Sequence, residues 1–343
     1  MKFKKASGII LCTVFMTVLF ISCSKNIRDN KDNLTEPSNL IEAVEKGNIA
    51  QVQKFIQEGA DINAQGKYGL TALMASSLLG DKEIVSMLLK AGANLDLQNE
   101  RWFGRTALMM SSEHKEIVSL LLQAGANPDL RDESGWTVLI SAVEKGHKEI
   151  VSVLLDAGVD PDLQDEDGQT ALMRASYNGH KKMVSILLQA KANPDLRDEY
   201  GYTALISAAK ESHKEIVSML LDAGANPDLQ DKSGDTALIL LSSADRNVRR
   251  YFKHKREVPI KGHKKMVSML LKAKASPDLQ NEAGYTALMF ASENGYKEIV
   301  SMLLKAGANL NLQNKYGKTA LSRAEGHKHR KIADLLIKAG ATR

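Results

Sequence analysis

The chain has 343 residues, with 46 Lys and Arg against 41 Asp and Glu, so its formal net charge is +5. Apolar residues make up 43% and charged residues 25%, which is typical of a globular protein and excludes a wholly disordered or polytopic chain. Both cysteines, Cys12 and Cys23, lie near the amino terminus. The body of the chain therefore has no disulfide framework, Cys-ligated metal or cysteine nucleophile.

Residues 1–22 have the pattern of a signal peptide. Three lysines near the amino terminus precede an uncharged, mostly apolar run over residues 8–21. This run is shorter than the roughly 20 residues that a membrane-spanning helix needs. It ends at Cys23, and polar residues follow at once.

The end of this segment resembles a bacterial lipoprotein signal, in which cleavage leaves a new N-terminal cysteine that carries lipid. The resemblance implies acylation of Cys23, for example by palmitate, and a protein secreted across the inner membrane and anchored to the cell envelope. The anchored protein could lie on the periplasmic face of the envelope or on the cell surface, and the resemblance is compatible with both locations. Phe20 stands where that signal usually has Leu, with Leu19 one place earlier. A cleaved signal peptide with an incidental Cys23 and an uncleaved anchor are the alternatives.

Residues 23–37 are predicted to form a flexible tether. The sequence SKNIRDNKDNLTEP after Cys23 is polar, charged and nearly free of apolar residues. Fully extended, it would reach roughly 45–50 Å. The lipid would thus hold a folded domain, predicted over residues 38–343, near a membrane without fixing its orientation.

One unit of about 33 residues repeats through that domain. Its most regular mark is the Thr of a T-[AV]-L motif, which occurs at positions 71, 106, 137, 170, 203, 236, 286 and 319. Most gaps are 33 residues; two unequal gaps flank Thr106 and together make two units, and one gap is longer by a 17-residue insertion. A divergent copy over residues 39–65 comes first, so we expect about nine repeats.

Each unit predicts two short helices, as residues 165–197 illustrate. Asp-Glu-Asp-Gly indicates a turn, Thr170 is placed to cap a first helix, and Asn-Gly ends that helix. The second helix has one apolar stripe, made of Met183, Val184, Leu187 and Leu188. Neither helix is long enough to be stable alone, so neighbouring units must stack.

The pattern D-x-x-G-x-T-A-L followed by G-H-K-E-I-V-S-x-L-L-x-A-G-A-N-P-D resembles the ankyrin repeat. The resemblance covers residues 39–343 except the insertion. It implies an all-α repeat solenoid of stacked helix-turn-helix repeats with β-hairpin-like finger loops, and a binding protein rather than an enzyme. The T-P-L-H of the family is replaced by T-A-L-M and similar sequences. The turns should therefore be less rigid.

Glycine closes the second helix in seven copies, at positions 59, 92, 125, 158, 224, 307 and 340. Lys191 and Lys274 stand at this place in the other two copies. If the backbone there is left-handed, each lysine should cost on the order of 1 kcal/mol relative to glycine.

The residues that could act in catalysis recur at the same position in successive repeats. This regularity argues against an active site, because an active site needs a set of residues that occurs once. Histidines recur 33 residues apart at positions 114, 147, 180 and 213. Stacked helices lie about 8–10 Å apart, whereas zinc ligands lie about 2.0–2.1 Å from the metal. We therefore expect these histidines to cap the turn before the second helix, and the recurring finger aspartates at 129, 162, 195, 228 and 278 to be structural. The sequence predicts no enzyme, metal or cofactor.

Recognition is expected where the repeats differ, chiefly at the finger tips. Tyr and Trp dominate binding hot spots because they offer large area with few rotors to freeze. In the ankyrin family, fingers and first helices line the groove where protein partners lie. The residues predicted to bind an unidentified protein partner are Tyr68, Trp102, Phe103, Trp136, Tyr200, Tyr202, Tyr285, Phe290 and Tyr316. The alternative is that these aromatic side chains only cover neighbouring fingers. The protein itself is expected to be a monomer.

The insertion, residues 245–260, is the second outlier. Across residues 244–261 there are seven cations and two carboxylates, a net charge of +5. The residues that suit a polyanion are Arg246, Arg249, Arg250, Lys253, Lys255 and Arg256. An alternative function is thus an envelope-tethered binder of anionic lipid, nucleic acid or glycan through residues 245–261. A solvated loop tolerated by the stack is the structural alternative.

Charge also differs between the two ends of each repeat. The finger roots are acidic, whereas the opposite loops are basic, as in His180-Lys181-Lys182 and His263-Lys264-Lys265. This polarity favours solubility, and it could also orient the protein on a charged surface.

Overall fold

The computed structural model describes residues 39–66, 68–243 and 260–342, with side chains from Gly262 onward in the last range. These residues form eighteen helices in nine consecutive pairs and no strand. The predicted signal peptide, Cys23 and the tether lie outside the described residues. So does the insertion up to residue 259, with all six of its proposed polyanion-binding residues.

The chain divides into two compact units, Met1–Glu166 and Asp167–Arg343. Unit 1 holds four helix pairs: α2 (Leu40–Glu45) with α3 (Ile49–Gln57), α4 (Ala72–Leu79) with α5 (Lys82–Lys90), α6 (Ala107–Met110) with α7 (Lys115–Gln123), and α8 (Val138–Lys145) with α9 (Lys148–Asp156). Unit 2 holds five: α10 (Ala171–Tyr177) with α11 (Lys181–Gln189), α12 (Ala204–Lys210) with α13 (Lys214–Asp222), α14 (Ala237–Ser243) with α16 (Ile260–Lys272), α17 (Ala287–Glu293) with α18 (Lys297–Lys305), and α19 (Ala320–Gly326) with α20 (Arg330–Lys338).

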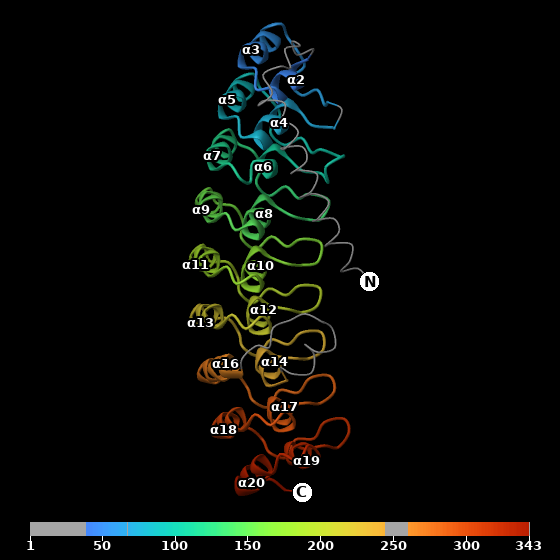
Figure 1. Ribbon diagram of the computed structural model, residues 1–343, viewed down its shortest axis with the longest axis vertical. Helices are drawn as coiled ribbons and strands as arrows, with labels where there is room; N and C mark the ends of the chain where they lie inside the picture. The colour runs from blue at the N-terminus through green and yellow to red at the C-terminus, as the bar shows by residue number, and fades with distance from the viewer. Residues whose placement is uncertain (1–38, 67, 244–259, 343) are drawn as a thin grey trace. The chain divides into compact units, whose positions relative to one another are not determined.

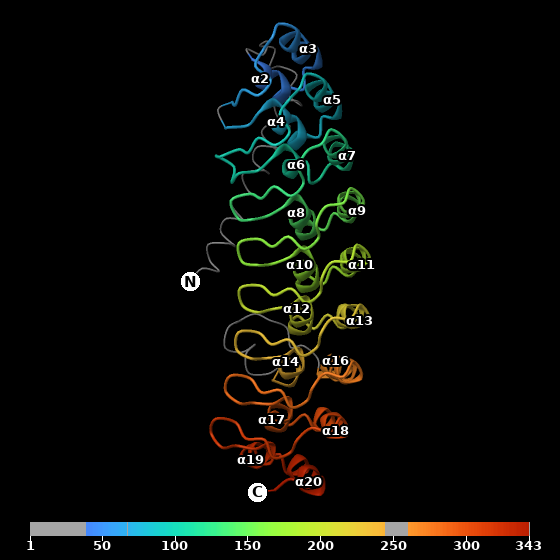
Figure 2. The ribbon, with the colours of Figure 1, turned by 180° about the vertical axis from the view of Figure 1, so that it is seen from behind.

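Each unit is a stack of two helical layers. The first helices of successive pairs, called inner helices here, contact one another, as α10, α12, α14, α17 and α19 do in unit 2. The second, outer helices form a parallel column, and the fingers project from the other side of the inner helices (Figures 1 and 2). The expected all-α stack of helix-turn-helix repeats is confirmed.

Threonine begins the inner helices, as predicted. In all eight T-[AV]-L motifs the backbone N–H three residues on donates to the threonine Oγ1, for example from Met173 to Thr170 at 3.2 Å and from Ile239 to Thr236 at 3.2 Å. Such a cap satisfies one of the unpaired N–H groups at a helix start and stabilises it by about 1 kcal/mol.

The core lies between the two layers. On α11, Val184 and Leu187 are fully buried and Met183 nearly so, whereas Leu188 is half-buried. Burying a side chain of this size contributes about 1.5–3 kcal/mol relative to exposure. The inner helices face the core with small residues such as Ala171 and Ala175, which let the layers approach closely.

The predicted left-handed helix ends are confirmed. All seven glycines have φ between 80° and 98°, and nothing lies within 4 Å of a Cβ built on any of them. Lys191 and Lys274 have φ of 63° and 64° at the same place. The two lysines therefore carry backbone strain.

The seventh repeat closes despite its insertion. Helices α14 and α16 contact each other and each contacts its neighbours in the stack. Across repeats, the Ser212 hydroxyl lies 3.2 Å from Nε2 of the buried His263. The described part of this repeat therefore keeps the packing of the others.

Candidate partner-binding face

Five fingers are held by a buried polar side chain at the root. Asp198 Oδ1 accepts hydrogen bonds from the backbone N–H groups of Tyr200 at 2.9 Å and Tyr202 at 2.8 Å. The backbone N–H of Asp198 donates to the Tyr202 carbonyl at 3.0 Å. Equivalent bonds surround the other finger roots Asp132, Asp231, Asn281 and Asn314. The loops that carry the candidate aromatic residues are therefore fixed by local hydrogen bonds.

Burial changes the pKa of the carboxyl groups at these finger roots. Removal from water raises the pKa of Asp198 and of Asp231, although the N–H groups that each accepts from act in the opposite direction. Their neighbour Asp235 has its pKa raised to about 6 by burial and by the charge of Asp231, against the hydrogen bond from Asn281. The fingers of unit 2 thus hold carboxyl groups that are costly to ionise.

A second set of bonds connects each finger to the next. Asp195 Oδ1 accepts from the Asn226 N–H at 2.8 Å, Asp228 from Ser276 at 2.8 Å, and Asp278 from Asn309 at 2.7 Å. Unit 1 has the same bond from Asn127 to Asp96 at 2.9 Å. We call this series the Asx ladder. It confirms that Asp195, Asp228 and Asp278 are structural.

In the second finger of unit 2 the predicted aromatic residues meet a lysine. The rings of Tyr200 and Tyr202 lie 6.1 Å apart. Lys210, at the end of α12, places Nζ 4.3 Å from the Tyr202 ring centroid and donates to its hydroxyl at 3.2 Å. A hydrogen bond with Glu199 raises the pKa of Tyr200 to about 12, so this phenol is neutral at physiological pH.

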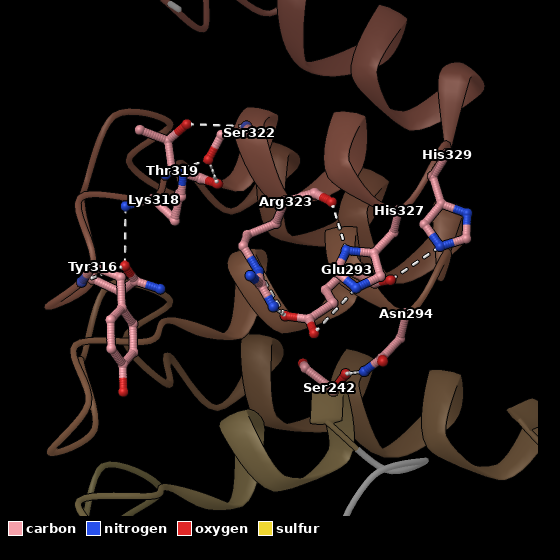
Figure 3. Close-up of polar contacts among 11 residues, drawn as sticks. Ser242, Glu293, Asn294, Tyr316, Lys318, Thr319, Ser322, Arg323, His327 and His329 are labelled. Atoms are coloured by element: carbon pink, nitrogen blue, oxygen red, sulfur yellow. Dashed lines mark hydrogen bonds and ion pairs between the residues drawn. The ribbon is translucent and has the colours of Figure 1, made fainter.

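A second cluster joins the fourth finger of unit 2 to its inner helices. Tyr285 stacks on Phe290 of α17 with centroids 4.6 Å apart, and the Arg323 guanidinium lies 5.5 Å from the Tyr285 centroid. Arg323 is in turn held by Glu293, whose side chain is fully buried, through an Nε–Oε2 bond of 2.7 Å (Figure 3). A cation and two aromatic rings are thus presented together.

The last finger exposes its tip. Tyr316 is 71% exposed, while its backbone N–H donates to Asn314 Oδ1 at 2.9 Å. Figure 3 shows its ring pointing away from the Glu293 cluster. Tyr68, in the second repeat of unit 1, is also exposed.

The third finger is the most unusual one in unit 1. Its tip is two residues longer than the others, and the residues on either side of the tip, Asn99 and Arg105, form an isolated antiparallel bridge. Asn99 Oδ1 accepts from the N–H groups of Arg101 at 2.8 Å and Trp102 at 3.1 Å. Phe103 has φ of 60°, which is strained for a bulky residue. Trp102, Phe103 and, in the next finger, Trp136 are half-buried.

The structure therefore brings two of the predicted groups together, Tyr200 with Tyr202 and Tyr285 with Phe290. Sequence reasoning missed Lys210, which contacts Tyr202, and Glu293, which holds Arg323 beside Tyr285. Both stand at the end of an inner helix, a place that Tyr177 fills in α10, so variation at that place was the available signal. Whether the aromatic residues contact a partner or only cover one another stays a prediction.

The expected role of the histidines was wrong. They do occupy the start of the outer helices, but they make no side-chain cap bond there. Instead, the His213 ring bonds through Nε2 to the Tyr177 carbonyl at 3.0 Å, and the His114 ring reaches the Leu78 carbonyl at 3.3 Å. Because a carbonyl only accepts, each ring must carry its proton on Nε2. Each of these two rings therefore joins the start of an outer helix to the inner helix of the preceding repeat.

The part of the chain that the structure describes contains no cluster of potential metal ligands. Within it, no group of three or more His, Cys, Asp or Glu side chains is placed to hold a metal ion. Across the same residues, no helix has both the length and the apolar character needed to span a bilayer.

A stack of capped helix pairs with polar fingers is the architecture of the ankyrin repeat, and comparison with known families gives the same result. The family model for three ankyrin repeats matches in overlapping windows, at residues 15–99, 40–132, 74–165, 112–198, 139–231, 191–258 and 258–342. The chain belongs to the ankyrin repeat family. This family is generally non-enzymatic, and its repeats imply a protein–protein interaction module.

Three curated proteins illustrate the similarity. The chain is 32% identical over 94 residues to the human mitochondrial disaggregase, covering 27% of this chain and 12% of that protein. It is 41% identical over 59 residues to ankyrin repeat domain-containing protein 29 of Danio rerio, covering 17% and 20%. It is 31% identical over 95 residues to a putative ankyrin repeat protein of Rickettsia bellii, covering 26% and 55%. The match to the disaggregase is confined to its ankyrin region.

Proposed function

We propose that the chain is a non-enzymatic scaffold that captures a protein partner across its fingers and inner helices. The observation that carries this proposal is the pair of aromatic and cationic clusters in unit 2, Tyr202 with Lys210 and Tyr285 with Phe290 and Arg323. Their fingers are fixed by hydrogen bonds at the roots, so little conformational entropy is lost when a partner binds.

The partner-binding proposal is tested by removing finger aromatics. The triple substitution Trp102→Ala, Trp136→Ala and Tyr202→Ala should abolish partner capture in cross-linking and affinity purification while the melting temperature changes little. Ile337→Ala is the control, because Ile337 is an exposed apolar residue of the outer helix α20 and belongs to neither a finger nor an inner helix. A triple variant that unfolds, or that captures the same partners as wild type, would contradict the proposed role of these residues.

We further propose that the scaffold is held at the bacterial envelope by a lipid on Cys23, with residues 23–37 as the tether. The support is the sequence pattern before Cys23 and the polar stretch after it. Cys23→Ala should move the protein from the detergent phase to the aqueous phase and abolish labelling by palmitate. Cys12→Ala, the only other cysteine substitution available, should leave both unchanged. Labelling of the Cys23→Ala variant would contradict the anchor.

A further inference from the structure

The outer helices of unit 2 begin with a row of basic side chains. The two residues at corresponding places near their starts are Lys181-Lys182, Lys214-Glu215, Lys264-Lys265, Lys297-Glu298 and Arg330-Lys331. These ten residues, called the basic edge here, hold eight cations and two carboxylates, a net charge of +6. They are exposed except Lys214 and Lys264, which are half-buried.

Unit 1 offers an internal comparison. The corresponding residues there are Ile49-Ala50, Lys82-Glu83, Lys115-Glu116 and Lys148-Glu149, so their net charge is zero. The core positions that follow are alike in both units, Ile84 and Val85 on α5 and Met183 and Val184 on α11. Packing therefore does not require a lysine at the second place, and the excess charge is a surface property of unit 2.

Ion pairs along the basic edge involve only some of its cations. Lys264 Nζ lies 2.8 Å from Glu298 Oε1, which joins α16 to α18, and Lys214 Nζ lies 3.2 Å from Glu215 Oε1. Both carboxylates are thus already paired. Among the described residues, Lys182, Lys265 and Lys331 have no carboxylate within ion-pair distance.

We propose that the basic edge docks the protein on a bilayer that contains anionic lipids. A lysine near such a surface is attracted by its negative potential, and headgroups that diffuse laterally can match cations one repeat apart. None of the ten residues is aromatic, and their neighbour Tyr296 is buried. The stacking surface that single-stranded nucleic acids use is therefore missing from this edge. The proposal rests on described residues of unit 2 and not on acylation of Cys23.

The test changes the three lysines at the second place of these pairs, Lys182, Lys265 and Lys331, to the glutamate that other repeats carry there. Lys182→Glu, Lys265→Glu and Lys331→Glu together lower the charge of the basic edge from +6 to zero, the value of unit 1. Full-length protein is floated with phosphatidylcholine vesicles, with or without phosphatidylserine, at low and high salt. Wild type should bind the anionic vesicles better at low salt, and the triple variant should lose that excess by about tenfold or more. Every protein in this comparison also carries Cys23→Ala, which removes the proposed lipid, so that anchoring does not mask the contribution of the basic edge.

The matched control makes the same change of charge at the other end of the same kind of helix. Lys272→Asp, Lys305→Asp and Lys338→Asp introduce a residue that Asp156 and Asp222 already carry at this place. This control should keep most of the excess binding. Equal losses in both triple variants, or an unchanged edge variant, would overturn the proposal. So would an edge variant that loses binding to soluble polyglutamate or RNA but still binds the vesicles.

Circular dichroism separates lost binding from lost folding. If the edge triple variant does not fold, the single variants Lys182→Glu and Lys265→Glu replace it. Each should lose about a third of the effect, measured on a logarithmic scale of affinity. Single variants that fold and bind like wild type would overturn the proposal.

Discussion

Asp235 and Asn281 form a complementary pair between neighbouring fingers of unit 2, in which Asn281 Nδ2 donates to Asp235 Oδ1 at 2.8 Å. Between the first two fingers of that unit the polarity is reversed, since Gln169 Nε2 donates to the root Asp198 at 3.4 Å. Where the facing residue is the acid Asp235, the root is the amide Asn281. The exchange avoids two facing carboxylates and keeps the hydrogen bond.

Asp235 should make stability depend on pH. Its pKa is raised from 3.8 to about 6, mainly by burial, so the folded state binds its proton more tightly than the unfolded state does. Its stabilising contribution is therefore fully present below about pH 4 and is lost as the pH rises through 6. Asp235→Asn should raise the free energy of unfolding by about 1–3 kcal/mol at pH 7 and by little at pH 4. Urea unfolding at both pH values measures this difference.

The exposed Asp222 provides the control for the pH experiment. Asp222→Asn, at the end of α13, should leave the pH dependence of wild type unchanged. A gain from Asp235→Asn that is equal at pH 4 and pH 7 would show that ionisation of this carboxyl is not the cause.

Lys191→Gly and Lys274→Gly should each stabilise the fold by about 0.5–1 kcal/mol. Both lysines have a left-handed backbone, which glycine adopts without a Cβ penalty. The greater flexibility of glycine in the unfolded chain offsets part of the gain. Thermal unfolding checks the direction. Lys191→Ala separates the causes, because alanine keeps the strained Cβ and should give no gain.

Gly179→Ala should destabilise unit 2 more than Gly224→Ala does. Both glycines are left-handed, with φ of 75° and 87°. A Cβ at Gly179 would lie 2.6 Å from Cε1 of His213, whereas none of the surrounding atoms lies within 4 Å at Gly224. The extra cost should be about 1–3 kcal/mol in urea unfolding.

The histidine itself supplies the control for the glycine comparison. In a His213→Ala background the two glycine substitutions should cost the same. A difference that persists without the ring would place the clash elsewhere. His213→Ala alone should also weaken the fold, because the Tyr177 carbonyl loses its donor.

Arg323→Met should cost about 3 kcal/mol because it leaves the carboxylate of Glu293 buried and without this cation. The Glu293 side chain is fully buried and that of Arg323 is 18% exposed. Adding Glu293→Leu, the residue that Leu78 provides at this place in α4, should recover most of the loss. Chemical denaturation of the single and double variants measures the coupling.

An exposed ion pair gives the contrast for Arg323. Lys264 and Glu298 have side chains that are 30% and 62% exposed. Lys264→Ala should therefore cost less than about 1 kcal/mol, and that cost should vanish at high salt. A similar cost for Arg323→Met and Lys264→Ala would show that burial of Glu293 is unimportant.

Local sequence patterns predicted most of the fold. Thr170 capping, the Val184 and Leu187 stripe and the left-handed backbone at Lys191 all depend on neighbours within a few residues, so spacing alone reveals them. The bond from His213 to the Tyr177 carbonyl joins residues 36 positions apart and depends on how one repeat sits on the next. The same holds for Glu293 and Arg323. The candidate site was therefore predicted as a set of fingers, but not in its pairing of rings with cations.

The Asx ladder constrains how such a chain can change its length. Each acceptor is matched by a donor one repeat further on, normally 31 residues away, as from Asn226 to Asp195. The bond from Ser276 to Asp228 spans 48 residues, so the rung is kept even where extra sequence separates the helices of a repeat. If whole repeats were duplicated or lost, each acceptor of the Asx ladder would still have a donor in the next repeat. A gain or loss of whole repeats would therefore require no new kind of hydrogen bond between neighbouring fingers.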